Sequence, residues 1–488
     1  MNSRQLWVVL ASILLITPLF LSFSLSNQAE AQTTPDVLVG IDVGYGVNVS
    51  EAKNIIDRVS SFTNFIVLGT TAISRSLKDL NETLQYAYDK GLYFMSFPPT
   101  LGFDPVLINQ SKVWLNYTKA NWSNHLVGFL YPWEDEPGGH QLDKGGRYYP
   151  VVDMNATDYA DAEAQFLNAT WFRDLYRAKS ILNYPLFTSD YALYWFDYKA
   201  GYDGLFAEFG WNYSTQINVA LCRGAATIQN KQWGVVVTFK YTQPPYMEPA
   251  EDLYKDLVYA YDNGAKYIVV LDTNEDWSAG CLTEEHFQAM RDFWEYIKNN
   301  PRKLHQVNER VAYQLPESYA YGFRGPLDKI WGVWEADMTS FMISTSVGIM
   351  LERYGSKLDI IYDEPPEQGR TYAYSKIVNW DDYATVADAW PSFSPWPGLT
   401  PDPTPTPTEI PDQNSSATPL ASPILSPIST DSLMPHATFT QTPEQKWTLG
   451  FSNGYLFVAV AVVVAGCFVG VAFVVRRRRR FAEKGNQE

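Results

Sequence analysis

The stretch LVGFLYPWEDE, residues 126–136, joins a short apolar run directly to aromatic and acidic side chains. A run of five or six apolar residues is typical of a strand buried on both faces in a parallel sheet. Polar residues that follow such a strand lie at its carboxyl end, where parallel α/β folds carry their functional groups. The stretch therefore predicts a buried strand over 126–131 that presents Glu134, Asp135 and Glu136 at one end of a sheet.

The same arrangement recurs along the chain. The predicted strands are 37–42, 65–69, 92–97, 126–131, 186–189, 204–208, 234–239 and 267–272. Apolar residues at helical spacing predict helices starting at Ser50 and Ser76, and over 158–182, 212–229, 249–263 and 283–299. Eight strands, each followed by a helix or a short helical loop, have the size and rhythm of a (β/α)8 TIM barrel.

An open, doubly wound sheet is the alternative for this pattern. Such a sheet usually carries a glycine-rich phosphate loop after its first strand. The turn after Asp42 contains Gly44 and Gly46 but lacks the G-x-G-x-x-G spacing. We therefore favour the α/β class with a (β/α)8 barrel over residues 36–302.

Two further segments follow the barrel. Residues 303–390 are predicted to form a small α/β accessory module, with strands at 311–316, 358–362 and 373–378 and a helix at 339–354. Residues 391–447 are rich in Pro, Ser and Thr, as in PDPTPTPT at 401–408, and hold few large apolar residues. Such a composition cannot bury a core and favours extended polyproline II, so we predict a disordered stalk.

The two ends of the chain predict export and anchoring. Residues 1–31 carry Arg4, an apolar core and a final Ala-Glu-Ala, the pattern of a signal peptide. The uncharged apolar run 455–475 would be about 31 Å long as a helix, enough to cross a hydrocarbon core of about 30 Å. Five arginines open the tail, 476–488, and resist translocation. We expect a single-pass cell-membrane protein with its ectodomain outside and its C-terminus in the cytoplasm.

Composition fits that location. The net charge of −17 argues against nucleic acid or anionic lipid as a ligand. Asn-x-Ser/Thr sequons predict an N-glycosylated surface protein. They occur at Asn48, Asn81, Asn109, Asn116, Asn121, Asn155, Asn168, Asn212 and Asn414. Cys222 and Cys281 are the ectodomain cysteines, and either a disulfide or two buried thiols is open to them.

Carboxylates mixed with Trp and Tyr at the carboxyl ends of the strands suit carbohydrate, because sugar rings lie on aromatic faces while their hydroxyls pair with carboxylates. Glycoside hydrolysis uses one protonated carboxyl group and a second one about 5–5.5 Å or about 6.5–9.5 Å away. Glu136 and Glu208 are the leading predicted catalytic pair, with Asp135 and Glu134 next. The predicted substrate-binding residues are Asp42, Trp133, Trp211, Lys240, Tyr241, Asp272 and Trp277.

Structural roles compete with each of these assignments. Residues 134–136 could form a solvated acidic loop, and Glu208 could pair with Arg223 or Lys240. Asp42 and Asp272 could cap strand ends or helices. The aromatic residues, including Trp195 and Tyr246, could be core packing.

Other chemistries have little support. The five histidines form no H-x-H or H-E-x-x-H pattern, and no G-x-S-x-G elbow is present. Residues 134–136 together with Asp272 could bind Ca²⁺, but the EF-hand spacing is missing. We expect neither a metal nor a cofactor.

Three stretches resemble TIM-barrel glycoside hydrolases: 131–139, 205–211 and the run Cys-Arg-Gly-Ala-Ala at 222–226 that continues to Lys-Gln-Trp-Gly at 231–234. The last is similar to an RGAA…K.WG stretch found before the seventh strand in several barrel glycosidases. The resemblance covers roughly residues 36–383 at the level of the fold, and the accessory module is similar in placement to those of such enzymes.

One departure matters. The commonest glycosidase clan places its nucleophile after the seventh strand, where this chain has Lys240 and Tyr241 and no carboxylate before Glu248. Other barrel glycosidases use the fourth and sixth strands, which suits Glu136 and Glu208. The resemblance thus implies a surface-anchored glycoside hydrolase-like protein acting on extracellular carbohydrate. The alternative is a non-catalytic carbohydrate-binding or cell-envelope protein that uses the barrel as a scaffold.

Overall fold

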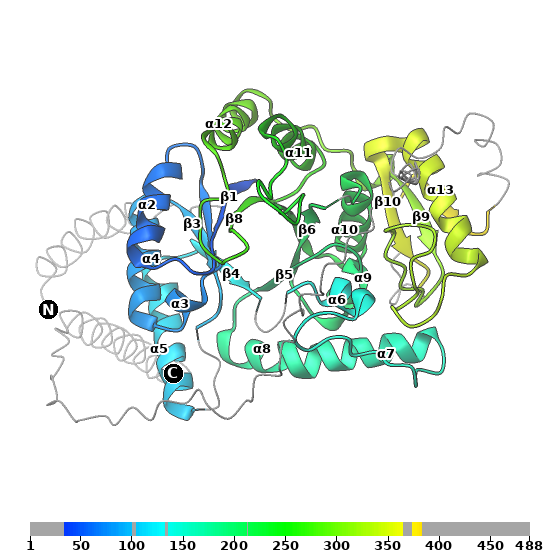
Figure 1. The fold of residues 1–488 in the computed structure, drawn as a ribbon, viewed down its shortest axis with the longest axis horizontal. Coiled ribbons are helices and arrows are strands. Elements are labelled where there is room, and N and C mark those ends of the chain that lie inside the picture. Colours follow the sequence, from blue (N-terminus) through cyan, green and yellow to red (C-terminus); the bar gives the residue numbers. More distant parts are fainter. Residues whose placement is uncertain (1–33, 100–103, 132–134, 212, 365–372, 383–488) are drawn as a thin grey trace, which may run out of the picture. The chain divides into compact units, whose positions relative to one another are not determined.

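The computed structural model describes residues 34–99, 104–131, 135–211, 213–364 and 373–382. Within them, eight parallel strands close into a barrel in the order β1 to β8, and β1 pairs with β8 (Figure 1). The strands are β1 Leu38–Val43, β2 Phe65–Leu68, β3 Tyr93–Ser96, β4 Leu126–Leu130, β5 Leu186–Asp190, β6 Gly204–Phe209, β7 Gln232–Val237 and β8 Tyr267–Asp272. The closed barrel confirms the predicted fold class.

Helices connect the strands and surround the barrel (Figure 1). They are α2 Val49–Val59, α3 Thr71–Ser74, α4 Leu77–Asp89, α5 Pro105–Asn121, α6 Pro137–Asp143, α7 Tyr159–Ala169, the π-helical η1 Thr170–Leu175, α8 Tyr176–Leu182, α9 Tyr194–Ala200, α10 Thr215–Gln229, α11 Ala250–Asp262 and α12 Glu284–Asn299. The helix predicted over 158–182 is therefore two α-helices joined by a π-helical turn.

Four α-helices have no counterpart in the predicted set: α3, whose four residues are too few to show a helical period, and three longer ones, each for a local reason. Helix α6 opens with Pro-Gly-Gly, which reads as a turn. Helix α9 is almost wholly buried and so has no polar face. Helix α5 carries apolar side chains on its exposed face as well as its buried one, so its sequence lacks a helical period.

Side-chain alternation along the strands decides what faces the barrel interior. The interior is filled by Leu38, Phe65, Val67, Tyr93, Met95, Leu130, Phe187, Phe206, Val236, Tyr267, Val269 and Leu271. Every second residue of a strand points to the same side. Leu38 and Phe206 point inward, so Asp42, four residues after Leu38, and Glu208, two residues after Phe206, point inward as well. Leu271 also points inward, so its neighbour Asp272 points away from the interior.

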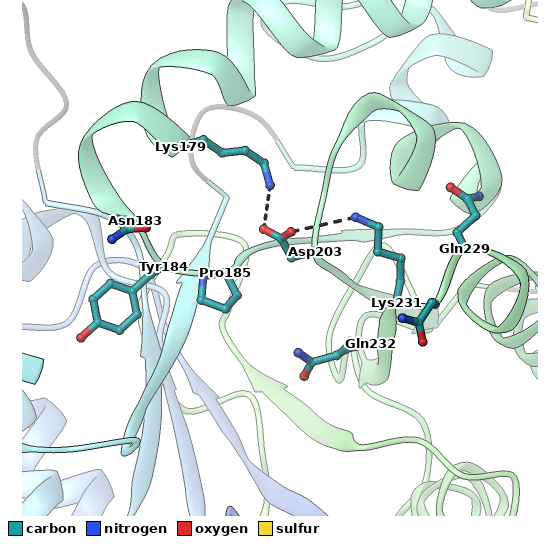
Figure 2. A pocket seen from close by; sticks show the side chains of 9 residues that line it. Lys179, Asn183, Tyr184, Pro185, Asp203, Gln229, Lys231 and Gln232 are labelled. Atoms are coloured by element: carbon teal, nitrogen blue, oxygen red, sulfur yellow. Dashed lines mark hydrogen bonds and ion pairs between the residues drawn. The ribbon is translucent and has the colours of Figure 1, made fainter. Parts of the chain in front are cut away.

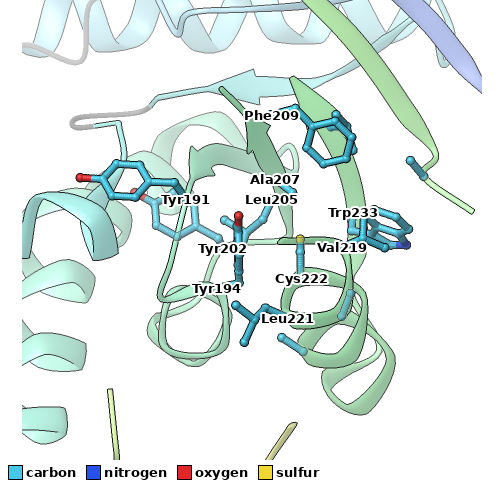
Figure 3. Packing of buried hydrophobic residues seen from close by; sticks show 14 of the residues in the cluster. Tyr191, Tyr194, Tyr202, Leu205, Ala207, Phe209, Val219, Leu221, Cys222 and Trp233 are labelled. Carbon is cyan, nitrogen blue, oxygen red and sulfur yellow. The ribbon is translucent and has the colours of Figure 1, made fainter. Parts of the chain in front are cut away.

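A second, larger core lies between the barrel strands and the helices. In the part shown in Figure 3, Tyr194, Leu205 and Cys222 pack between α9, β6 and α10. Of the two alternatives for the cysteines, the structure has free thiols: Cys222 and Cys281 are both buried and unpaired with each other. Burial raises the pKa of Cys281 to about 12, so this thiol is inert at neutral pH.

Residues 303–382 include a three-stranded parallel sheet in the order β10-β9-β11, in the region predicted as an accessory module. Its elements are η2 Val307–Glu309, β9 Val311–Leu315, α13 Met338–Tyr354, η3 Gly355–Lys357, β10 Leu358–Tyr362 and β11 Lys376–Asn379. Helix α13 packs against β9 and β10, and β10 packs against the barrel helix α10.

The RGAA stretch of α10 makes this contact. Arg223 donates from Nε to Oδ1 of Asp359 on β10 at 2.7 Å, and its Nη2 donates to the Leu358 carbonyl at 2.9 Å. A Cβ on Gly224 would lie 2.3 Å from the carbonyl oxygen of Ile360, so only glycine allows the helix this close to the strand. The stretch thus joins the barrel to the module.

The predicted signal peptide, stalk, transmembrane helix and tail fall outside the described residues. Helices in the described part of the chain include none with the length and apolarity needed to cross a membrane.

Candidate active site

A cavity of about 390 Å³ opens at the carboxyl ends of the barrel strands. Its lining combines carboxyl groups with aromatic rings. The lining residues are Asp42, Tyr45, Tyr131, Asp135, Glu136, Glu208, Trp211, Val236, Thr238, Phe239, Tyr241, Thr242, Tyr246, Leu271, Thr273, Asn274, Glu275 and Trp277. The barrel therefore brings residues more than 230 positions apart in the sequence to one pocket.

Glu208 is a buried carboxyl group in the lining of this cavity. It is 3% exposed, and its Oε1 accepts a hydrogen bond from the Ser189 hydroxyl at 2.5 Å. Ser189 in turn accepts from the Tyr131 hydroxyl at 2.7 Å, so a tyrosine–serine relay fixes the carboxyl group. Asn218 donates to the backbone carbonyl of Glu208 at 2.6 Å.

Glu136 reaches the same point from the loop after β4. Its backbone is left-handed, with φ +44°, and its amide donates to the Ser189 carbonyl at 3.1 Å. Oε2 of Glu136 lies 3.2 Å from Nε2 of His140, one helical turn later on α6. The backbone of Glu136 is therefore attached to β5, and its side chain to α6.

Asp190 at the end of β5 holds the first turn of α6. Its carboxylate accepts from the amides of Gly138 at 2.6 Å and Gly139 at 3.0 Å. A Cβ on Gly138 would lie 2.4 Å from the Leu193 Cβ, and one on Gly139 would lie 2.2 Å from the Tyr191 ring. The two glycines let α6 pack closely enough on the loop after β5 to place Glu136 beside Glu208.

The Glu136 and Glu208 carboxyl groups interact directly. Burial raises the pKa of Glu208 well above its ordinary value, the charge of Glu136 raises it further, and a hydrogen bond shared with Glu136 adds to the effect, while the Ser189 hydroxyl opposes it. Oε2 of Glu208 finds no hydroxyl, amide or cationic donor among the described residues. Two carboxylates close together repel each other, so the charge of Glu136 and the burial of Glu208 both favour the protonated form of Glu208.

The alternative ion-pair role for Glu208 is not what the structure shows. Arg223 lies on the outer side of α10 and pairs with Asp359 of the module. Lys240 lies near Glu248 and Asp256. Neither cation contacts Glu208 in the described part of the chain.

Asp42 contributes a third carboxyl group to the cavity. It is 2% exposed, and its Oδ1 has no hydrogen-bond partner among the described residues. Burial raises the pKa of Asp42 well above its ordinary value, against a hydrogen bond from the Gly69 backbone. An unsatisfied buried oxygen in a cavity is a ready acceptor for a ligand hydroxyl.

Aromatic side chains form the rim of the cavity. Tyr45 packs on Trp277 with ring centroids 5.0 Å apart, and Trp211 packs on Phe239 at 6.3 Å. Trp277 and Tyr241 are exposed at the mouth. Apolar faces next to buried carboxyl groups are the combination that sugar rings require.

Not every predicted residue reaches the cavity. Asp272 faces outward from β8, and its Oδ1 accepts from the amides of Gly280 and Leu282 at 2.9 and 3.1 Å, so it holds the loop after β8. Lys240 also lies outside the lining. Trp195 is buried and donates to Glu364 at 2.8 Å. Trp133 and Glu134 are outside the described residues.

Several lining residues have no counterpart among the predicted site residues. Tyr45 and Tyr131 line the cavity, and Ser189 contacts Glu208 directly. Tyr131 and Ser189 lie at strand ends, where alternation could have indicated them. Tyr45 follows a glycine turn and carries no such signal.

A second carboxyl pair consists of Glu248, in the connection between β7 and α11, and Asp256 on α11. Burial and the charge of Asp256, against that of Lys240, raise the pKa of Glu248 to about 8. Burial likewise raises the pKa of Asp256 to about 6. The backbone carbonyl of Glu248 is 2.8 Å from Nε2 of His286 on α12, a contact that joins the connection carrying Tyr241 and Tyr246 to α12.

A larger hollow, about 690 Å³, lies at the opposite end of the strands (Figure 2). Lys179 and Lys231 approach Asp203 there, at 2.8 and 3.9 Å. Asp203 also accepts from the Leu186 amide at 3.0 Å, so this cluster ties β5 to β6 at the end where barrels carry stability rather than chemistry. Among the described residues, no three His, Cys, Asp or Glu side chains are grouped so that they could hold a metal ion.

No protein-family model matches the chain, and no curated protein matches it. Among solved structures, β-galactosidase from Marinomonas ef1 aligns with 10% identity and a TM-score of 0.45, over 70% of this chain and 72% of that one. GH5_18 from Bifidobacterium longum, crystallised with Manβ1-4GlcNAc, aligns with 11% identity and a TM-score of 0.41, over 71% and 96%. Thiamine phosphate pyrophosphorylase from Pyrococcus furiosus aligns with 13% identity and a TM-score of 0.29, over 54% and 96%.

The chain is thus similar to glycoside hydrolases among solved structures, as its sequence resembles them. Sequence identities of 10–13% and TM-scores of 0.45 or less do not allow an activity to be transferred to this chain. Any function must be argued from the cavity itself.

Proposed function

We propose that this chain is a glycoside hydrolase in which Glu208 is the proton donor and Glu136 the second carboxylate. One observation carries the proposal: Glu136 and Glu208 line one cavity with an aromatic rim, and burial together with the charge of Glu136 raises the pKa of Glu208. A raised pKa keeps a carboxylic acid protonated at neutral pH, which is what protonation of a glycosidic oxygen requires.

In the proposed reaction, Glu208 gives its proton to the glycosidic oxygen as the bond from that oxygen to the anomeric carbon breaks. Glu136 either attacks the anomeric carbon, forming a glycosyl-enzyme ester that a water then hydrolyses while Glu208 takes a proton from that water, or itself takes a proton from a water that attacks the anomeric carbon directly. The first course needs the two carboxyl groups about 5–5.5 Å apart around the bound sugar, and the second about 6.5–9.5 Å.

The remaining cavity groups have roles as ligands of the sugar in this proposal. Trp277, Tyr241 and Trp211 offer flat apolar surfaces at the mouth, and Asp42 offers an acceptor deeper in. Asp135 lines the wall beside Glu136. Extracellular carbohydrate is the expected substrate class.

We further propose that the barrel is displayed outside the cell, held by a helix over 455–475. The apolar run, the arginines after it and the Pro/Ser/Thr-rich segment before it support this location. Labelling intact cells with a membrane-impermeant lysine reagent tests it. Lysines such as Lys53 should be labelled, whereas Lys484 in the tail should be labelled only after the membrane is opened.

Activity of the full chain, purified in detergent and offered a panel of glycans, tests the hydrolase proposal. Glu208→Gln and Glu136→Gln should each lower kcat/KM by about 10²–10⁴-fold, the usual contribution of a general acid or base. Glu251→Gln is the control, because Glu251 is an exposed carboxylate on α11 that lies outside the cavity lining. Its kcat should be unchanged.

Equal activity in the wild type and Glu208→Gln would remove Glu208 from the mechanism. Tight binding of a glycan without cleavage by the wild type would instead favour the carbohydrate-binding scaffold.

A further inference from the structure

Helix α5 exposes an apolar stripe, which is unusual among the barrel helices. Val106 and Val113 are each 61% exposed, and Tyr117 on the same face is 41% exposed. Helices α2, α4, α10, α11 and α12 expose no large hydrophobic side chain. Because the buried face of α5 already packs through Trp114 and Leu115, the stripe is not needed to attach the helix. An exposed apolar surface of this kind indicates something that covers it.

The same helix carries three glycosylation sequons. They begin at Asn109, Asn116 and Asn121, and all three asparagines are exposed. Residues three or four apart on a helix have Cβ atoms about 5–6 Å apart. Asn109 is three residues after Val106 and four before Val113, and Asn116 is three after Val113. Tyr117 is four before Asn121. Every member of the stripe is therefore a direct neighbour of a sequon asparagine.

A sequon next to exposed aromatic side chains also occurs where α7 passes through η1 into α8, the helix that packs beside α5. Asn168 at the end of α7 is exposed, and four residues later Phe172 is 67% exposed. Tyr176 on α8, also exposed, contacts the Phe172 ring at 6.4 Å between centroids. Helix α8 packs against α5, and α7 continues from the other end of α8 along the barrel (Figure 1).

We propose that N-linked glycans on Asn109, Asn116, Asn121 and Asn168 are attached to this side of the barrel and fold back over its exposed apolar side chains. The C–H faces of a sugar pack on aromatic and aliphatic surfaces, which removes apolar area from water. The covered residues are Val106, Val113, Tyr117 and Phe172. This role is independent of the proposed hydrolysis and depends only on passage of the chain through a glycosylating compartment.

Asn81 on α4 provides the contrasting case. It also begins a sequon, but its side chain is half-buried, and its Oδ1 accepts from the Trp114 indole at 3.1 Å. No large hydrophobic side chain is exposed on α4. The proposal assigns Asn81 no glycan, because its side chain is used in packing α4 on α5.

Glycopeptide mass spectrometry of the full chain, expressed in a host that N-glycosylates exported proteins, tests the first part. Asn109, Asn116, Asn121 and Asn168 should be occupied and Asn81 should be empty. Empty sequons on α5 would overturn the proposal.

Hydroxyl-radical footprinting of the full chain tests whether the glycans cover the stripe. A triple variant, N109Q/N116Q/N121Q, should raise the oxidation rate of Tyr117 several-fold and leave Phe172 unchanged. N168Q should do the reverse. Phe341 on α13 is the internal reference, since it is 41% exposed and α13 carries none of the sequons changed in either variant, and neither variant should change it.

Two results would contradict the covering role. In one, Tyr117 and Phe172 are oxidised at the same rate with and without glycans. In the other, the triple variant protects Tyr117 and runs as a dimer in size-exclusion chromatography, which would assign the stripe to a second copy of the chain.

Discussion

At the scale of single residues, the pKa of Glu208 is the property on which the proposed chemistry depends. Burial and the neighbouring Glu136 raise it, while the hydrogen bond from Ser189 lowers it. Burial has a larger effect on this pKa than the hydrogen bond from Ser189. A buried carboxylate loses the water that stabilises its charge, and one hydroxyl replaces only part of that water. Ser189 therefore adjusts the range of pH over which Glu208 keeps its proton.

Replacing Ser189 with alanine should move the alkaline limb of the activity profile to higher pH. The variant removes a stabiliser of the Glu208 carboxylate, so the pKa of Glu208 rises and the acid form persists further. A hydrogen bond to a charged group is worth about 1.5–3 kcal/mol, which corresponds to roughly one to two pH units. The profile of kcat/KM against pH measures the shift.

Thr188→Ala is the control for this change. Thr188 is equally buried and adjacent in β5, but its hydroxyl contacts only the Ser189 carbonyl, at 3.4 Å. An equal shift in both variants would show that β5 packing, and not the hydrogen bond, sets the alkaline limb.

At the scale of elements, two connections place the catalytic candidates. The first is α6, whose opening amides are held by Asp190. Asp190→Asn exchanges one acceptor oxygen for a donor that faces the Gly138 and Gly139 amides. We expect a loss of about 1–3 kcal/mol in the free energy of unfolding, the cost of unsatisfied buried groups, and a fall in kcat as Glu136 moves. Urea unfolding and steady-state kinetics measure the two effects.

The exposed Asp262 accepts from the Tyr296 hydroxyl at 3.3 Å rather than from backbone amides, and Asp262→Asn, which keeps an acceptor oxygen, should be nearly neutral in both measurements. Full activity in Asp190→Asn would show that α6 does not position Glu136.

The second connection is the loop after β7, where Glu248 is held largely neutral by burial. Its pKa in the folded chain is about 8, compared with an ordinary value of 4.5. A raised carboxyl pKa means that the folded state binds more protons than the unfolded state, so stability is fully present below about pH 4.5 and is lost as the pH rises through about 8. Glu248→Gln should flatten this decline, which the rise in pKa from 4.5 to about 8 puts on the order of 5 kcal/mol in the wild type.

Chemical denaturation at a series of pH values between 5 and 9 measures that slope. Glu251→Gln, an exposed change on α11, should leave it as in the wild type. An unchanged slope in Glu248→Gln would mean that other groups carry the pH dependence.

At the scale of the whole molecule, the barrel and the module depend on one close contact. Asp359 is fully buried and accepts from Arg223 and Arg310, each at 2.7 Å, and from Tyr374 at 2.8 Å. One carboxylate thus ties α10 of the barrel to β9 and β10 of the module. The contact needs Gly224, because any side chain there would meet the β10 backbone.

Gly224→Ala should therefore lower the free energy of unfolding by about 1–3 kcal/mol, the usual cost of overpacking. The module should also become more sensitive to protease, which limited proteolysis followed by mass spectrometry would detect. Gly325→Ala is the control, since a Cβ there has no neighbour within 4 Å. Equal stability of the two variants would argue against close packing as the role of Gly224.

The barrel could be predicted because its signals are local. Apolar runs such as 204–207 and 267–271 can be buried only as strands of a covered sheet, and the helices between them show a 3.6-residue period. The three longer unpredicted helices lack that period: α9 is buried all round, α6 begins with glycines, and α5 is apolar on both faces. Their helical state depends on what packs against them.

The sequence by itself determined the order of strands and helices, and it put Glu208 at a strand end and Glu136 in the loop after a strand, because both depend on local pattern. Only the tertiary structure decided that Glu136 lies close enough to raise the pKa of Glu208, that Ser189 and Tyr131 support Glu208, and that Arg223 joins the module. It also turned Asp272 away from the cavity, since strand alternation changes side with each residue. The physical reason is that a pKa, an ion pair and a cavity are set by distances between segments, which the local pattern of residues does not record.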